Sequence, residues 1–441
     1  MAVAPLAAVV VWLRTVLCAV MVVGSMGVAA AQTSHTALHR GGHGGRTTPT
    51  DDPGGGAPAP APAPTNEHFA PGAVVALPGR GASLAWSPDG TRIAAGGHFH
   101  DAATGLRYDT RVVDVASATL TRSYSCHYYW VIATAWASTP GLGNVIADGG
   151  GDHMVKVWDA DAAGSTRCRP GQFPTADGAV RGMYQINGWI TGLAFSPDGR
   201  FLAGTSRDRT VRIWSLEPGA RQGRLVALWY DAQAGNFLSV AWAPDGRHLV
   251  TGDRLGRIAV WGFDPDVDGW SGADVDRFAK VAFGLQPLWF SENSELVSKV
   301  PLWSDGDHVR VWKVAWSPDG TRVAGTGNDG ILSVLDAATG MPVYRVGAPH
   351  PSALHGLDWS PDGTLLAAGA ANRKIYVFDA ATGALFDTLA GSLDVVTAVR
   401  WSPDGSTLAS TAGGPLLSGA SNQMSIGPDQ ALRLWTRLPA N

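Results

Sequence analysis

Charged side chains are scarce in this sequence, since Asp, Glu, Lys and Arg make up only 16% of its 441 residues. The 33 basic and 37 acidic residues give a formal net charge of −4 at pH 7, and the basic residues form no large block. Proteins that bind a phosphate backbone need clustered positive charge. We therefore expect no nucleic acid among the partners of this protein.

The sequence also lacks several signatures of catalysis. It contains no G-x4-G-K-S/T phosphate loop, no G-x-S-x-G nucleophile turn and no H-E-x-x-H pair. His98, His100 and Asp101 are close in sequence, but no further ligand follows at metal spacing, which favours a solvated loop over a metal site. We predict that the protein is not an enzyme and has no catalytic residue, metal or cofactor.

The N-terminus is nearly free of charge. Residues 1–31 are almost wholly apolar, interrupted by Arg14, and end in three alanines before Gln32. This pattern is typical of a cleaved signal peptide, and an uncleaved signal anchor fits the same residues. We expect an exported protein (secreted, periplasmic or at the cell surface), with membrane anchoring only through residues 1–31. Residues 32–71 are rich in Gly, Ala, Pro and His, which predicts a disordered linker.

Cysteine is rare as well, with three in the chain. Export would leave two of them, Cys126 and Cys168. In an oxidising compartment such a pair can form a disulfide. A Cys126–Cys168 disulfide is therefore a candidate feature, and two free thiols are the alternative.

A repeated turn is what the sequence does contain, most clearly as Trp316-Ser317-Pro318-Asp319-Gly320. Proline presets the backbone at the second turn position, Asp bonds its own backbone, and Gly takes the last position at no steric cost. Seven copies of this unit begin at an aromatic residue: Trp86, Trp136, Phe195, Trp242, Trp316, Trp359 and Trp401. Repeats of 40 to 50 residues are typical of propeller blades, and longer spacings indicate loop insertions.

The copy at Phe195 shows what each unit folds into. An apolar strand at 191–195 leads into the turn, a second strand follows at 200–205, and a third at 210–214 alternates polar and apolar residues. One such sheet cannot bury both faces, so the blades must close into a ring. We predict an all-β, seven-bladed propeller of four-stranded antiparallel blades over residues 72–441. A spare strand at 73–77 would complete the last blade.

The ends of the third strands carry a family resemblance. They read Val157-Trp158-Asp159, Ile213-Trp214, Val260-Trp261 and Leu434-Trp435, and the chain resembles the WD40-repeat propellers, whose third strands end in Trp-Asp. That family places a structural Asp six residues before the Trp, and the matching residues here are Asp152, Asp208, Asp329 and Asp429. The other blades have Arg107, Leu255 and Asn372 there. The resemblance implies that several blades lack the family's full Asp-His-Ser/Thr-Trp network.

Insertions on one face indicate where a partner binds. In this family the loops between blades and between second and third strands share one face, and here they include 98–108, 126–130, 183–189 and 413–430. Exposed aromatic residues on loops often anchor interfaces. We therefore expect a monomeric, non-catalytic scaffold that binds a protein or peptide through Tyr128, Tyr129, Trp130, Tyr184 and Trp189. A small ligand, a glycan or an enzymatic reaction at the central channel mouth is the alternative. The role of the large insertion at 263–307 stays open.

Overall fold

The computed structural model describes residues 67–77, 79–101, 105–162, 164–167, 180–216, 223–231, 235–265, 280–283, 285–291, 309–413 and 429–439. These residues belong to the compact unit Pro60–Asn441. Within them every regular element is a β-strand, and none forms a helix long and apolar enough to cross a membrane. The expected signal peptide and most of the expected linker lie outside the described residues.

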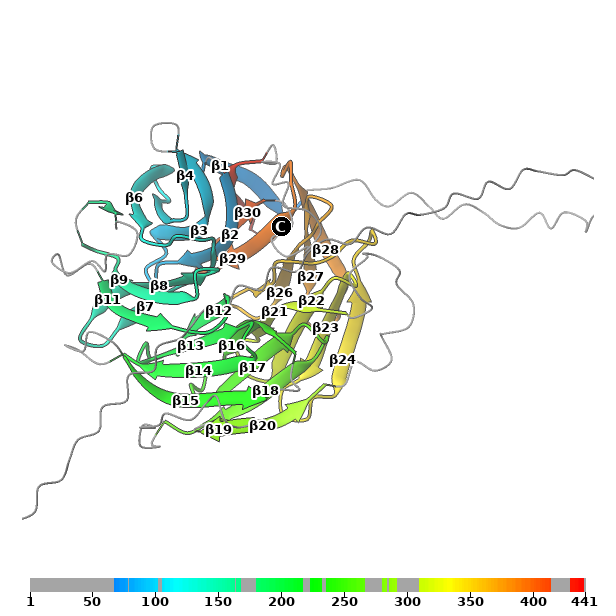
Figure 1. Ribbon diagram of the computed structural model, residues 1–441. Coiled ribbons are helices and arrows are strands. Elements are labelled where there is room, and N and C mark those ends of the chain that lie inside the picture. Colours follow the sequence, from blue (N-terminus) through cyan, green and yellow to red (C-terminus); the bar gives the residue numbers. More distant parts are fainter. Residues whose placement is uncertain are drawn as a thin grey trace, which may run out of the picture. The chain divides into compact units, whose positions relative to one another are not determined.

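The strands form seven antiparallel blades that follow one another around a ring, as predicted (Figure 1). Blade 1 consists of β2 (Gly79–Trp86), β3 (Arg92–Asp101), β5 (Thr110–Asp114) and β6 (Thr119–Ser125). Blade 2 consists of β7 (Val131–Thr139), β8 (Gly143–Gly150), β9 (Met154–Asp159) and β11 (Val180–Gln185). Blade 3 consists of β12 (Ile190–Phe195), β13 (Phe201–Ser206), β14 (Thr210–Ser215) and β15 (Arg224–Asp231).

Blades 4 to 7 repeat the pattern. They consist of β16 (Phe237–Trp242), β17 (His248–Asp253), β18 (Ile258–Phe263) and β20 (Leu285–Phe290); β21 (Val311–Trp316), β22 (Arg322–Gly327), β23 (Ile331–Asp336) and β24 (Pro342–Gly347); β25 (Asp358–Trp359), β26 (Leu365–Gly369), β27 (Lys374–Asp379) and β28 (Leu385–Ala390); and β29 (Val396–Trp401), β30 (Thr407–Ala412), β31 (Ala431–Arg437) and β1 (Phe69–Ala76).

The insertion at 263–307, whose role the sequence left open, supplies β20, the fourth strand of blade 4. Three further short strands extend the sheets beyond their regular four strands. The insertion supplies one of them, β19 (Lys280–Phe283), which pairs with the outer edge of blade 3. In blade 1, β4 (Gly105–Arg107) folds back on β3, and β10 (Thr166–Arg167) pairs in parallel with β6. The expected loop at 98–108 is therefore in large part an extension of the sheet.

The first strand closes the ring. β1 pairs antiparallel with β31, from Phe69 opposite Arg437 to Ala76 opposite Ala431. Blade 1 then bonds to blade 7 across the seam, because Thr397 Oγ1 donates to the Gly81 carbonyl at 2.7 Å and Trp86 Nε1 donates to the Arg400 carbonyl at 3.0 Å. The predicted closure is confirmed, and the closing strand begins at Phe69, before the residues that the sequence marked.

The repeated turn has a uniform structure in blades 1, 3, 5, 6 and 7. In blade 1, Ser87 Oγ donates to Asp89 Oδ1 at 2.5 Å and accepts from the Arg92 amide at 2.9 Å, while Gly90 has a φ of 71°. Hydrogen bonds from the Ser87 hydroxyl, which has the larger effect, and from the Thr91 amide lower the pKa of Asp89 to about 2. The turn is thus built from its own side chains, which explains why the sequence signal is strong.

Each blade has two ends, the turn end and the loop end. The turn end carries the connections between first and second and between third and fourth strands. The loop end carries the second-to-third turns and the loops that link successive blades, because the four strands alternate in direction. Apolar side chains fill the space between blades, as where Tyr124 of blade 1 stacks on Trp158 of blade 2 at 4.5 Å between ring centroids.

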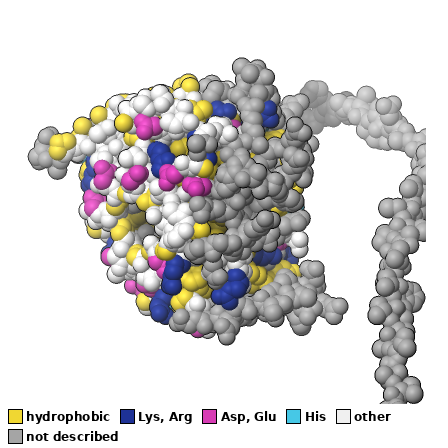
Figure 2. Space-filling model, turned by 90° about the vertical axis from the view of Figure 1, so that its left-hand side faces the viewer, with side chains coloured by type: hydrophobic (Ala, Val, Ile, Leu, Met, Phe, Trp, Pro, Cys, Tyr) yellow, Lys and Arg dark blue, Asp and Glu magenta, His cyan; other side chains and the backbone are white. Residues whose placement is uncertain are grey.

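Charge on the surface is mixed. On the face shown in Figure 2, acidic and basic side chains are interspersed among apolar and uncharged ones. This distribution agrees with the small formal net charge of −4.

Candidate functional site

A loop and a turn meet at the loop end of blade 2. The loop at 126–130 links β6 to β7, and the turn at 151–153 links β8 to β9. Asp152 joins the two: its carboxylate accepts from the Met154 amide and from the Tyr128 amide, each at 3.3 Å. His153 takes a φ of 66°, a left-handed conformation that closes the turn tightly. The loop is thereby fixed to the blade beneath it.

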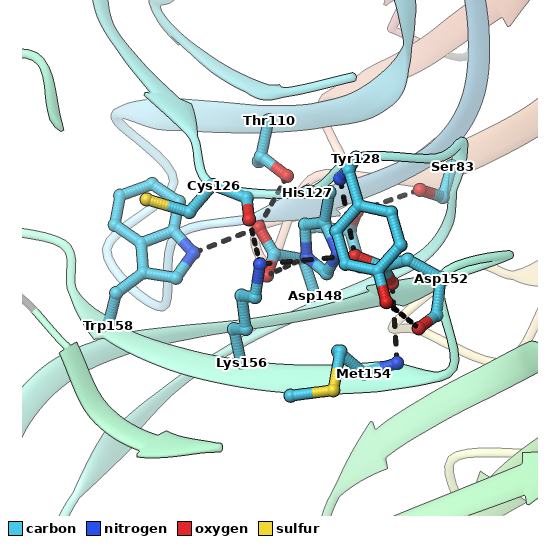
Figure 3. A network of polar contacts seen from close by, with 11 residues as sticks. Ser83, Thr110, Cys126, His127, Tyr128, Asp148, Asp152, Met154, Lys156 and Trp158 are labelled. Carbon is cyan, nitrogen blue, oxygen red and sulfur yellow. Dashed lines mark hydrogen bonds and ion pairs between the residues drawn. The ribbon is translucent and has the colours of Figure 1, made fainter. Parts of the chain in front are cut away.

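Beneath this loop lies a buried polar network, defined here as Thr110, His127, Asp148, Asp152, Lys156 and Trp158 (Figure 3). His127 bridges two carboxylates, with Nε2 2.9 Å from Asp148 Oδ1 and Nδ1 2.9 Å from Asp152 Oδ2. Asp148 also accepts from Trp158 Nε1 at 3.0 Å and from Thr110 Oγ1 at 2.7 Å. Thr110 belongs to blade 1, so the network joins two blades.

The charges of the network balance when His127 is protonated. Lys156 donates to the Cys126 carbonyl and lies 3.9 Å from Asp152. Burial alone would lower the pKa of His127, but the nearby carboxylates, Asp148 most strongly, raise it overall. Burial opposes ionisation of Asp152, yet His127 and Lys156 lower its pKa. Two cations thus face two carboxylates, which is how buried charge is tolerated in a protein interior.

The network departs from the family pattern at one place. In blade 4 the Trp261 indole donates to Thr251 Oγ1, and in blade 7 the Trp435 indole donates to Ser410 Oγ. Blade 2 has the carboxylate of Asp148 in that role. Asp148 and Lys156 are residues that sequence reasoning missed. The signal for Asp148 was its position ten residues before Trp158, the same offset that separates Thr251 from Trp261.

The other expected turn residues lie in second-to-third turns. Asp208 accepts from the Thr210 amide at 3.1 Å, Asp329 from the Ile331 amide at 3.1 Å, and Asp429 from the Leu393 amide at 2.6 Å. In blade 4, where Leu255 stands at the family's Asp position, Asp253 accepts from the amides of Leu255 and Arg257. Reasoning from a fixed spacing to the Trp missed Asp253, because this residue lies two positions before Leu255 in the sequence.

Aromatic rings continue from the network across the loop end, and this set is called the aromatic ladder: His98, Tyr108, Tyr129, Trp130 and Trp189. Ring centroids lie 5.2 Å apart for His98–Trp130, 5.8 Å for Tyr108–Tyr129 and 5.5 Å for Tyr129–Trp189. A side chain on Gly151 would collide with the Tyr129 ring, so the glycine leaves room for it. The ladder spans blades 1, 2 and 3.

The predicted partner-binding residues occupy different environments. Tyr128 is 63% exposed and Tyr129 39% exposed, whereas Trp130 is 8% exposed and packs within the ladder. Trp189 is half-buried. Tyr184 lies on β11, opposite Val155, instead of in a loop, and its side chain lies outside the described residues. Most of the expected insertion at 413–430 also lies outside them.

Cys126 lies directly before His127 and is disulfide-bonded. Cys168 lies outside the described residues, and Arg167 pairs with Ser125 in the sheet register. The pairing of Cys126 with Cys168 stays a prediction. In the described part of the chain, no group of three or more His, Cys, Asp or Glu side chains is arranged to hold a metal ion. Both ring nitrogens of His127 are engaged by carboxylates.

A second set of titratable groups lies on or just before the innermost strands of blades 5 to 7. Burial, with Arg400 adding to it, lowers the pKa of Lys313 to about 8. Burial, with Lys313 adding to it, lowers the pKa of His355 to about 4. Asp358 lies 3.5 Å from Arg400.

Comparisons with known proteins point to one class. The family described as "WD domain, G-beta repeat" matches residues 182–215, 228–262, 300–336 and 383–435. The family described as "Anaphase-promoting complex subunit 4 WD40 domain" matches residues 343–404. The matches fall on blades 2 to 7 of the fold described above.

Similar proteins share only part of their length with this chain. Protein tipD of Dictyostelium discoideum is 31% identical over 98 residues, which are 22% of this chain and 14% of tipD. Nuclear distribution protein nudF of Aspergillus terreus is 32% identical over 94 residues, which are 21% of this chain and 17% of nudF. Protein transport protein SEC13 of Pyricularia oryzae is 29% identical over 124 residues, which cover 24% of this chain and 40% of SEC13. The chain thus matches less than half of each of these relatives.

Proposed function

The chain belongs to the WD40-repeat β-propeller family, and on this basis we propose that it is a non-catalytic, monomeric scaffold that binds a protein or peptide through its loop end. The observation that carries the proposal is the exposed pair Tyr128 and Tyr129 on a fixed support. The Tyr128 amide donates to the Asp152 carboxylate, and its hydroxyl donates to the Asp152 carbonyl at 3.2 Å. Exposed aromatics that are already ordered lose little entropy on binding.

The similar proteins support this reading by analogy. Two of them are named for nuclear distribution and protein transport, and none of the three names describes a chemical reaction. Fold alone does not fix function, so their activities are not carried over to this chain. What transfers is the expectation that a rigid ring of blades presents loops to another macromolecule.

Export is part of the proposal. Its support is the apolar segment at 1–31 and the disulfide at Cys126, because disulfides persist in oxidising compartments. The partner would then be an extracellular, periplasmic or cell-surface protein, and anchoring of the scaffold would require that residues 1–31 stay attached.

A pull-down from cell-surface and culture fractions tests the proposal. Wild-type protein should capture one protein at stoichiometric levels, identified by mass spectrometry. The variant Tyr128→Ala/Tyr129→Ala should lose it, and Met341→Ala should keep it, because Met341 is 66% exposed at the turn end of blade 5. Equal capture by all three proteins would place the interface elsewhere, and capture of nothing by the wild type would contradict the scaffold function.

A second candidate function is binding of a small ligand or glycan, or catalysis, near the ring centre. Lys313 and His355 favour it, because an amine whose pKa is about 8 can act as a base or nucleophile. A thermal-shift screen of metabolites and glycans tests this candidate. A hit that stabilises the wild type but not Lys313→Gln would support it, and a screen without hits would leave the scaffold as the better reading.

A further inference from the structure

A recess at the loop end of blades 3 to 5 is lined by three arginines. It is called the arginine recess and consists of Arg207, Leu238, Arg254, Arg310 and Trp312. Arg207 follows β13, Arg254 follows β17, and Arg310 directly precedes β21. All three positions lie at the end of the blades that also carries Tyr128 and Tyr129.

The fold does not require arginine at these places. The first turn residue after the second strand donates its amide to the loop that enters the same blade: Arg207 to the Trp189 carbonyl at 3.0 Å, and Arg254 to the Asn236 carbonyl at 2.9 Å. Other blades make the equivalent bond from a small or uncharged residue, namely Gly151, Asn328, Ala371 and Gly413. Since backbone atoms alone form this contact, the side chains of Arg207 and Arg254 are available for another purpose.

The charges of Arg207 and Arg254 have no counter-ion among the described residues. The carboxylates next to them in sequence are already engaged: Asp208 lies 3.2 Å from Arg212, and Asp253 lies 2.7 Å from Arg257. Burial, with the charges of Arg254 and Arg310 adding to it, lowers the pKa of Arg207 to about 10. Like charges held together at a half-buried site cost free energy, which a bound anion would recover.

Aromatic rings hold two of the guanidinium groups. The Arg207 guanidinium lies 4.1 Å from the Trp189 ring, and that of Arg310 lies 5.7 Å from the Trp312 ring. Such contacts orient a guanidinium group. The recess is therefore ordered before any ligand arrives.

The size of the recess suits a side chain better than a free metabolite. It is shallow and open to solvent, with a cavity volume of about 10 Å³, which is room for about one water molecule. Sites for drug-sized ligands usually enclose roughly 300 to 1,000 Å³. A carboxylate on a short side chain is small, and its two oxygens match the paired N–H groups of arginine.

We infer that the arginine recess binds a carboxylate side chain from an acidic segment of a protein partner. Trp189 contacts both Tyr129 of the aromatic ladder and Arg207 of the recess, so one extended segment can lie across both. The inference deepens the proposed scaffold function and rests on it. It adds the chemistry of the partner: an aromatic or apolar contact at the tyrosines and an acidic residue at the arginines.

Fluorescence anisotropy with a labelled hexaglutamate peptide tests the recess in the full protein. A hexaglutamine peptide is the uncharged probe. The variant Arg207→Gln/Arg254→Gln removes both available guanidinium groups. Its matched control is Arg200→Gln/Arg247→Gln, which removes the same charge from exposed side chains at the turn ends of the same two blades. All variants are first checked by thermal melting.

We expect hexaglutamate to bind the wild type at low ionic strength and hexaglutamine not to bind. Arg207→Gln/Arg254→Gln should weaken hexaglutamate binding about tenfold or more, and the control should change it by less than about twofold. Equal weakening in both variants would reduce the effect to net charge and overturn the inference. Displacement of the peptide by inorganic phosphate at equal concentration would also overturn it, because the site would then serve a free anion.

The pull-down separates this inference from the scaffold function. If the wild type captures a partner and Arg207→Gln/Arg254→Gln captures as much of it, the recess assignment is wrong while the scaffold stands. If the wild type captures nothing, the scaffold function fails, and the peptide titration still decides whether the recess binds carboxylates. A melting temperature of Arg207→Gln/Arg254→Gln well below that of the control would mean that the arginines serve stability, which also overturns the inference.

Discussion

His127 and Asp148 lie 2.9 Å apart, from Nε2 to Oδ1, with both side chains fully buried in blade 2. The contact joins the loop before β7 to the end of β8, directly under the exposed tyrosines. Buried charge pairs often add little net stability compared with apolar residues, but removing one partner leaves the other charge without compensation. This pair therefore fixes the conformation of the loop that the proposed interface uses.

Replacing His127 with Ala should destabilise the protein strongly. The change leaves Asp148 and Asp152 buried with only Lys156 to balance them, and breaking a buried pair typically costs about 3 to 5 kcal/mol. The matched change in blade 4, Thr251→Ala, removes an uncharged partner of Trp261 and should cost about 1 to 2 kcal/mol. Denaturant unfolding measures both. A His127→Ala loss no greater than that of Thr251→Ala would contradict a stabilising role for the charges.

The contribution of His127 should also depend on pH. Its folded-state pKa is raised, so the stability it adds is fully present below the unfolded pKa and is lost as pH rises through the folded pKa. The groups that face it are Asp148, Asp152 and Lys156. The denaturation midpoints of wild type and His127→Gln should therefore differ more at about pH 6 than at about pH 9. A gap that stays constant or widens with rising pH would show that the pKa is not raised.

The stability that Asp152 contributes changes with pH in the opposite direction to that of His127. The pKa of Asp152 is lowered by His127 and Lys156, although burial opposes this, so the stability it adds is present above its ordinary pKa and is lost as pH falls through the folded value. Asp152→Asn should thus lose stability near neutral pH and approach the wild type in acid. Melting curves at descending pH check this, and a variant that stays equally destabilised in acid would refute it.

The Cys126 disulfide should connect to Cys168. Arg167 pairs with Ser125, so the residue before Cys168 lies beside the residue before Cys126 in the sheet register. Peptide mapping without reductant should give one peptide that contains both cysteines, and their joint replacement by Ser should cost about 2 to 4 kcal/mol. Alkylation of Cys168 in the unreduced protein would rule the bond out and would weaken the support for export.

The sequence predicted the ring because each blade carries its own turn. In the turn of blade 1, Ser87, Asp89 and Gly90 supply every special contact within a few residues, so the pattern is legible without tertiary information. The closing strand was predictable because a spare strand, expected at 73–77, precedes the first copy of the repeat. The fourth strand of blade 4 was not, because β20 is separated from β18 by part of an insertion with no repeat signal.

The site was less predictable, because its residues act across strands. Lys156 alternates with apolar neighbours in β9 and would be expected to face solvent, yet the Cys126 carbonyl covers its amine. Arg207 and Arg254 occupy equivalent positions, because each directly follows the second strand of its blade, and this is visible only once the ends of β13 and β17 are known. Nor could spacing alone distinguish the exposed tyrosines from Trp130, since three adjacent aromatics in one loop carry no periodicity.

That difference within the loop gives the last prediction. Trp130 is 8% exposed and lies between His98 and Tyr129, so Trp130→Ala should leave a cavity and cost about 3 kcal/mol or more. Tyr128 is 63% exposed, and Tyr128→Phe removes only its hydrogen bond to the Asp152 carbonyl, at a cost of about 1 kcal/mol or less. Denaturant unfolding measures both variants.

Binding should rank these variants in a different order from stability. Tyr128→Ala should reduce partner capture while its melting temperature stays close to that of the wild type, because the exposed ring contributes contact area and not core packing. Trp130→Ala should lower both, since the loop loses its support. If Tyr128→Ala instead unfolds as readily as Trp130→Ala, the tyrosine is part of the core, and the interface must be sought at the arginine recess alone.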